Sequence, residues 1–145
     1  MCGVADARWF KGCINTVGST YVNGLFLIPD VFTWPASVTT TPENSINKTD
    51  ASYSAVSFTA SEFKTLEQSG IVFLPAAGSR DGSADSAFVS DVNINGYYWI
   101  ANLLTDPYSE QFSFSDSFIY PNTQGTSLKE RYMAQSVRLL IDVTE

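Results

Sequence analysis

One segment of the chain carries a complete set of helix-boundary signals, and it lies between residues 58 and 70. Thr59 is placed as an N-cap, and Glu62, three residues later, completes a capping box. Gly70 is placed to end the helix, because glycine readily adopts the left-handed conformation found just past a helix C-terminus. These signals predict one helix at about 60–69.

The side chains of this segment predict which face of the helix is buried. Phe58 and Phe63 stand at the two positions of a hydrophobic staple. Phe63 and Leu66 are three residues apart, so they share a face that is expected to pack on a sheet. Lys64 and Gln68 are expected to point to water. The segment is therefore interpreted as structural.

The other apolar segments are short and are separated by turn and loop residues, which is typical of strands. We expect the Asn-Gly pair at 23–24 to make a turn just inside the first strand, and the pair at 95–96 to make a hairpin. Stretches 33–53 and 75–87 are rich in small and polar residues and are expected to be loops. The strands are expected at 22–28, 71–74, 97–100, 111–114 and 136–143. The predicted fold class is α+β, with short mixed strands, one clear helix and long irregular loops.

The segment at 111–114 alternates phenylalanine with polar residues. Because side chains alternate between the two faces of a strand, Phe112 and Phe114 are expected to face a core, and Gln111 and Ser113 to face water. The residues expected to form the core of this part of the chain are Trp99, Phe112, Phe114, Val137 and Leu139.

Size and charge exclude several classes of protein. The chain has 145 residues, 44% of them hydrophobic and 16% charged, which fits one folded domain covering 1–145. No run of about 18 apolar residues is present to cross a membrane. The net charge of −7 has the wrong sign for binding a phosphate backbone, so nucleic acid is not an expected partner.

The chain contains no histidine, which removes whole classes of chemistry. Ser-His-Asp and Cys-His nucleophilic pairs and histidine-ligated metal sites are impossible within it. Only two cysteines are present, Cys2 and Cys13, too few for a disulfide scaffold or a four-thiolate zinc site. Whether these two cysteines pair or stay reduced is open at this point.

Four motifs occur along the chain in a set order: VNGLFLIPD at 22–30, VFLPAAGSRDG at 72–82, NGYYW at 95–99 and QSVRLL at 135–140. On these motifs the chain resembles the major paralogous domain first named in Fibrobacter and abundant in gut Bacteroidetes. The resemblance implies a C-type lectin-like fold, of the subclass shared with formylglycine-generating enzymes. It also implies that the single domain 1–145 lacks an N-terminal portion that family members carry.

The chain departs from the family pattern after the NGYYW motif. Family members usually continue with Ser-Ser-Thr, whereas this chain has Ile100-Ala101-Asn102. The departure resembles the variable region of a diversity-generating retroelement target protein, whose fold is kept while selected codons are rewritten. It implies a variable ligand-binding region at 97–138 and a protein or glycan ligand on a cell or phage-host surface. The implied location is extracellular, on a cell surface or on a phage virion.

Aromatic residues favour the same location on physical grounds. Residues 97–132 hold nine of the 20 aromatic residues and interleave them with polar ones, so these rings cannot all face one core. Tyrosine offers a large contact area at low entropic cost and a hydroxyl that orients a ligand. The candidates for an exposed binding face are Tyr98, Ile100, Asn102, Leu104, Ser113, Ser115, Phe118, Tyr120, Lys129, Glu130 and Tyr132.

Enzymatic and metal chemistry are not expected. The copper-dependent oxidation known from the enzyme branch of this fold needs a C-terminal cysteine pair, and no cysteine follows Cys13. The Glu-Pro-Asn loop of calcium-dependent lectins is absent, and the acidic residues lie in polar contexts that do not raise a carboxyl pKa. We therefore expect a non-enzymatic recognition domain without a cofactor. A second interpretation stays open: a fixed adhesin or structural module of a surface lipoprotein or fibre, with calcium-independent glycan binding on an aromatic face.

Overall fold

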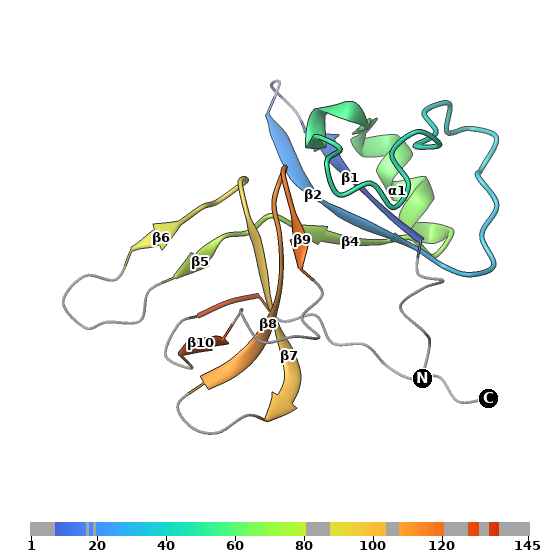
Figure 1. Ribbon diagram of the computed structural model, residues 1–145. Helices are drawn as coiled ribbons and strands as arrows, with labels where there is room; N and C mark the ends of the chain where they lie inside the picture. Colours follow the sequence, from blue (N-terminus) through green and yellow to red (C-terminus); the bar gives the residue numbers. More distant parts are fainter. Residues whose placement is uncertain are drawn as a thin grey trace.

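The computed structural model describes residues 8–16, 18, 20–80, 88–103, 108–120, 128–130 and 134–136. Its elements are one α-helix, one 3-10 helix and short strands, which confirms the α+β class (Figure 1). In chain order they are β1 (Arg8–Asn15), β2 (Tyr21–Ile28), η1 (Tyr53–Ala55), β3 (Ser57–Thr59), α1 (Ala60–Gln68), β4 (Val72–Pro75), β5 (Ser79–Arg80), β6 (Val89–Ser90), β7 (Gly96–Leu103), β8 (Tyr108–Phe114), β9 (Ile119–Tyr120) and β10 (Leu128–Glu130).

The strands form three small sheets. The first sheet has the order β3-β1-β2-β4, the second has β10-β8-β7 with β9 paired to β8, and the third is the pair β5-β6. In the first sheet β1 and β2 are antiparallel and β3 adds parallel to β1. A bridge between Gly78 and Gly96 links the start of β7 to the region of β5. Neither helix in the described ranges is long and apolar enough to span a membrane.

The first sheet is covered on both faces, which explains the continuous apolar run in β2. Phe26 and Ile28 face a core under α1, whereas Leu25 and Leu27 face a second core shared with β7 and β8. Successive side chains of a strand point to opposite faces, so a strand buried on both sides must be apolar throughout. Figure 1 shows α1 on one side of β1 and β2, and β7 and β8 on the other. The two cores thus lie in separate layers.

The helix prediction is confirmed at both ends. The Thr59 side chain accepts a hydrogen bond from the Glu62 backbone, and the Glu62 carboxylate accepts one from the Thr59 backbone. Leu66 is fully buried and Phe63 packs against the first core. Gly70 has a φ of 95°, the left-handed conformation expected at the helix end. Lys64 and Gln68 are exposed, as expected.

Two turn predictions are wrong. The Asn-Gly pair at 23–24 lies inside β2, where Gly24 pairs with Gly12. Glycine is needed there because the Phe73 ring packs over it, and a Cβ at Gly24 would lie 2.5 Å from that ring. The pair at 95–96 makes no hairpin, because Gly96 opens β7 and pairs with Phe114 of β8.

The long loop predicted at 33–53 is confirmed up to η1, but it is not a purely surface feature. Val38 is buried in the first core, and Trp34 and Ile46 pack against it. Asn47 fixes the loop to β1, since its backbone N–H donates to the Trp9 carbonyl and its side-chain Oδ1 accepts from the Trp9 N–H. The loop therefore serves as a lid over one edge of the first core.

The prediction that one face of β8 is exposed to water is wrong. Phe114 is fully buried and Phe112 packs against the second core, but Gln111 and Ser113 are buried as well. Gln111 accepts a hydrogen bond from the Gln135 side chain, so its polar end is satisfied on the covered face. Trp99 is half-buried, and Val137 and Leu139 lie outside the described residues.

Candidate functional site

Three residues of the expected binding face are buried. Tyr98 is only 7% exposed, because it points from β7 into the second core and stacks on Phe114 with ring centroids 6.1 Å apart. Its hydroxyl donates a hydrogen bond to the Pro75 carbonyl over 2.8 Å. Ser113 and Ser115 are also buried. The expectation that these three side chains belong to an exposed face is therefore wrong.

Phe118 and Tyr120 do reach the surface as a pair. Their ring centroids lie 4.9 Å apart, Tyr120 is 56% exposed and Phe118 is half-buried. The turn before them is tight, because the Ser115 N–H donates to the Phe118 carbonyl and the Ser117 N–H donates to the Ser115 hydroxyl. Pairing of β9 with β8 then holds Tyr120 beside Ser113.

The other candidates of the expected face fall in two groups. Ile100 and Asn102 lie in β7, and Lys129 and Glu130 lie in β10. Leu104 and Tyr132 lie outside the described residues. Among the residues whose side chains are described, Tyr120 is the one exposed aromatic residue of the predicted variable region, and the half-buried Phe118 lies against it.

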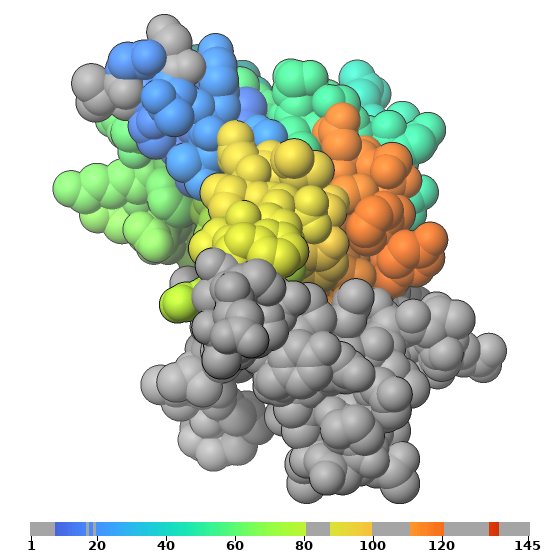
Figure 2. Space-filling view, turned by 90° about the vertical axis from the view of Figure 1, so that its left-hand side faces the viewer, coloured from blue at the N-terminus to red at the C-terminus, as the bar shows by residue number. Residues whose placement is uncertain are grey.

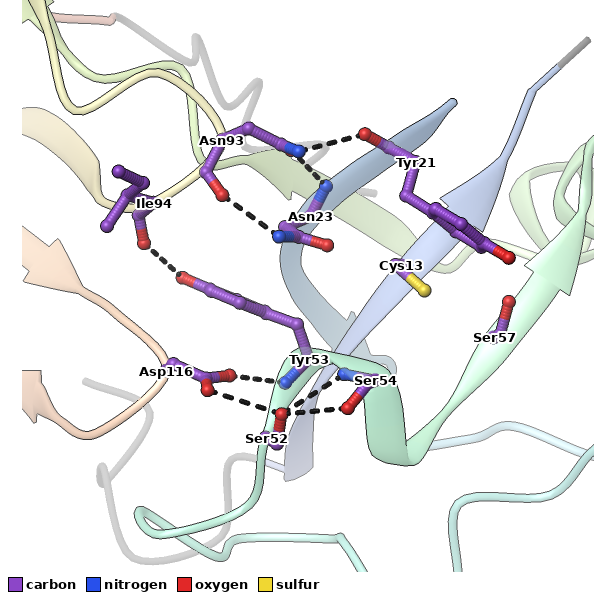
Figure 3. Close-up of a pocket in the computed structure, with 10 residues that line it drawn as sticks. All are labelled: Cys13, Tyr21, Asn23, Ser52, Tyr53, Ser54, Ser57, Asn93, Ile94 and Asp116. Carbon is purple, nitrogen blue, oxygen red and sulfur yellow. Dashed lines mark hydrogen bonds between the residues drawn. The ribbon is translucent and has the colours of Figure 1, made fainter. Parts of the chain in front are cut away.

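A pocket of about 530 Å³ lies elsewhere, at the end of the first sheet where β1 turns into β2 (Figure 3). Tyr21 and Asn23 share the strand face of Leu25, but β7 and β8 cover only the Leu25 end. The uncovered end becomes the floor of the pocket. In Figure 2 the segment 88–99, in yellow, lies between β1–β2, in blue, and residues 111–120, in orange. The lining residues are Cys13, Tyr21, Asn23, Ser52, Tyr53, Ser54, Ser57, Asn93, Ile94 and Asp116.

One wall of the pocket is fixed by a pair of asparagines. Asn93 Oδ1 accepts from the Asn23 N–H over 2.6 Å, and the Asn93 carbonyl accepts from Asn23 Nδ2 over 2.9 Å. Asn93 Nδ2 donates to the Tyr21 carbonyl over 2.9 Å. Asn93 has a φ of 64°, a left-handed conformation that asparagine tolerates better than most residues. These bonds hold the turn before β7 against β2.

The opposite wall is organised by Asp116. Its Oδ1 accepts from the Tyr53 N–H over 2.6 Å, and its Oδ2 accepts from the Ser52 hydroxyl over 3.2 Å. The Tyr53 hydroxyl donates to the Ile94 carbonyl over 3.2 Å, which connects the two walls. Burial, reinforced by the nearby Asp116 charge, raises the pKa of Tyr53, so this hydroxyl stays protonated and keeps donating.

Behind this wall a buried lysine connects β1 of the first sheet to the turn after β8 of the second sheet. Lys11 is 0% exposed, and its Nζ donates to the Thr49 carbonyl over 2.6 Å and to the Asp116 carbonyl over 3.0 Å. Burial lowers the pKa of Lys11, and the charges of Asp116 and Asp50 oppose that shift. Lys11 does not line the pocket, so it positions Asp116 from behind.

Sequence reasoning missed the pocket. Asn93 and Asn23 are 70 positions apart, and no motif links them. The Asn-Gly pair at 23–24 predicts only a turn, and the count of two cysteines leaves open whether Cys13 is paired or reduced. Cys13 is a buried free thiol, and Cys2 lies outside the described residues.

The described part of the chain contains no group of three or more Cys, Asp or Glu side chains arranged to hold a metal ion. Comparisons with protein-family models, with curated proteins and with solved structures find no match to this chain.

Proposed function

We propose that this chain is a non-enzymatic ligand-recognition domain on a C-type lectin-like scaffold, as in the target proteins of diversity-generating retroelements. Replaceable side chains on a fixed framework would contact a protein or glycan on another cell or on a phage host. The observation that carries the proposal is the aromatic pair of the exposed Tyr120 and the half-buried Phe118, which lies within the predicted variable region.

The setting of this pair suits recognition. Tyrosine and phenylalanine rings provide much contact area while few side-chain torsions have to be fixed. The turn that carries them is held by hydrogen bonds of Ser115 and Ser117, so little further order is needed on binding. An aromatic ring that becomes buried at the centre of an interface contributes about 2 kcal/mol or more. Phe118 and Tyr120 are therefore the proposed anchors.

Codon-by-codon sequencing of the encoding locus across a natural population tests this proposal. Substitutions concentrated at Phe118, Tyr120, Ile100 and Asn102, with Phe114 unchanged, are expected. A reverse transcriptase gene beside a near-copy of this coding segment, differing at template adenines, is expected as well. Uniform low variation along the whole segment, with no such near-copy, would overturn the diversified-surface proposal.

A second candidate function is favoured by a different observation. Four apolar side chains lie more than half exposed around β6 and the turn that follows it: Phe88, Val89, Val92 and Ile94. Several exposed apolar side chains on one short segment favour contact with another protein surface. A fixed structural module of a surface lipoprotein or fibre would pack this patch against its neighbouring domain. In that case the four codons are conserved in the population and the codon for Tyr120 is no more variable than they are.

A further inference from the structure

The pocket at the end of the β1–β2 hairpin lies apart from the aromatic pair of the proposed recognition surface. Neither Phe118 nor Tyr120 lines it. Its volume of about 530 Å³ falls within the ~300–1,000 Å³ that small-molecule sites commonly have. We infer that this pocket binds a neutral saccharide directly, without a metal ion.

The pocket offers polar groups that the fold leaves unused. Within the described residues, no hydrogen bond is made by the hydroxyls of Tyr21 and Ser57 or by Asn23 Oδ1. Asn93 Nδ2 donates one of its two N–H groups to the Tyr21 carbonyl, so a second N–H is present at the pocket. Donors and acceptors are thus mixed within one small volume. A sugar hydroxyl both donates and accepts, so it matches such a mixture better than a ligand with one kind of polar group.

Apolar surface borders these polar groups. Tyr21 is 46% exposed and Ile94 is 59% exposed, and both line the pocket. Figure 3 shows that the hydrogen bond at Tyr21 is made by its carbonyl oxygen, so the ring is not engaged by it. The C–H faces of a sugar ring pack against aromatic and aliphatic side chains, while its hydroxyls point to polar partners.

The charge of the pocket lining argues against anionic ligands and against a calcium ion. Among the described residues that line the pocket there is no lysine or arginine, and Asp116 is the one charged side chain. An anionic ligand such as a phosphate would therefore meet a carboxylate and no compensating cation. One carboxylate also falls short of a calcium site, which takes about six to eight oxygen ligands. A neutral polyhydroxylated ligand avoids both difficulties.

The polar walls are already in place before a ligand arrives. The three bonds of Asn93 fix one wall, and the bonds from Tyr53 and Ser52 fix Asp116 in the other. A preformed site loses little conformational entropy on binding, so even a few hydrogen bonds and one ring contact give measurable affinity. The expected Kd for a monosaccharide is in the millimolar range, corresponding to about −4 kcal/mol.

Amide NMR titration of the 145-residue chain in the presence of EDTA provides the test. The probes are methyl α-D-mannopyranoside, methyl β-D-galactopyranoside, N-acetyl-D-glucosamine and cellobiose. Saturable shifts centred on Tyr21, Asn23 and Asn93 are expected for at least one of them. N-acetylneuraminic acid, a charged sugar, is expected to bind more weakly because of Asp116.

Matched variants separate this pocket from the proposed recognition surface. Tyr21→Ala removes the ring and is expected to weaken the affinity about tenfold, whereas Tyr21→Phe and Ser57→Ala each remove one hydroxyl and weaken it less. Tyr120→Ala leaves the titration unchanged. Shifts that centre on Phe118 and Tyr120 would overturn the pocket assignment and support the recognition surface. If none of the neutral sugars produces a saturable shift, the saccharide inference is overturned. The proposed function is then still decided by the sequencing test.

Discussion

Lys11 Nζ lies 3.0 Å from the main-chain oxygen of Asp116, and this contact joins the middle of β1 to the turn after β8. The same ammonium donates to the Thr49 carbonyl, so one buried side chain holds three segments together. Two of them reach the pocket walls, since Asp116 lines the pocket and Thr49 leads into Ser52. A buried charge therefore maintains the geometry that the saccharide inference depends on.

Replacing Lys11 by Met keeps the aliphatic stem and removes the ammonium. Two part-buried carbonyl oxygens then lose a charged donor, which costs about 1–3 kcal/mol. We expect urea unfolding of Lys11→Met to show a loss of that size. Lys64→Met on the exposed face of α1 is the matched control and should change stability by less than about 0.5 kcal/mol. Equal stability of the two variants would contradict the assigned role of Lys11.

Asn93 allows its side-chain bonds and its backbone conformation to be tested separately. Asn93→Gly keeps the φ of 64° accessible but loses the two bonds of the side chain. Asn93→Ala loses the same bonds and adds the strain of a left-handed alanine, about 1 kcal/mol. Thermal or urea unfolding should therefore rank wild type above Asn93→Gly and Asn93→Gly above Asn93→Ala. Equal stability of the two variants would show that the backbone conformation carries no cost.

How much of the fold and of the pocket can be predicted from the sequence depends on how far apart along the chain the contacting residues lie. Helix α1 was predicted at both ends because Thr59, Glu62 and Gly70 act on their near neighbours. The burial of Tyr98 and Ser113 was not predictable, because it depends on how the second sheet packs against the first. An alternating pattern shows that two faces differ, but it does not show that both are covered. The pocket depends on partners such as Asn23 and Asn93 that no local pattern connects.

The capping box makes stability depend on pH. Hydrogen bonds from the backbone and side chain of Thr59 lower the pKa of Glu62 below its usual 4.5. A carboxyl whose pKa is lower in the folded state adds stability above the unfolded pKa and loses it as the pH falls through the folded value. We expect Glu62→Gln to be less stable than wild type at neutral pH, with the difference shrinking well below pH 4.5.

Urea unfolding of wild type and Glu62→Gln, at neutral pH and well below pH 4.5, measures the difference in their stability. Glu67→Gln, on the same helix but outside the capping box, is the control. A gap between wild type and Glu62→Gln that stays constant across this range would mean that the Glu62 charge does not contribute to the cap.

Tyr98 and Tyr120 should separate stability from recognition. Tyr98 is buried and donates a hydrogen bond to the Pro75 carbonyl, so Tyr98→Phe is expected to cost about 1 kcal/mol and Tyr98→Ala about 3–5 kcal/mol. Tyr120 is exposed, so Tyr120→Ala should change stability by less than about 0.5 kcal/mol. Chemical denaturation of the three variants measures both effects. If Tyr98→Ala stays folded with near wild-type stability, the second core does not depend on this ring. If Tyr120→Ala unfolds the chain, Tyr120 is a structural residue, and loss of binding in that variant no longer supports a recognition surface.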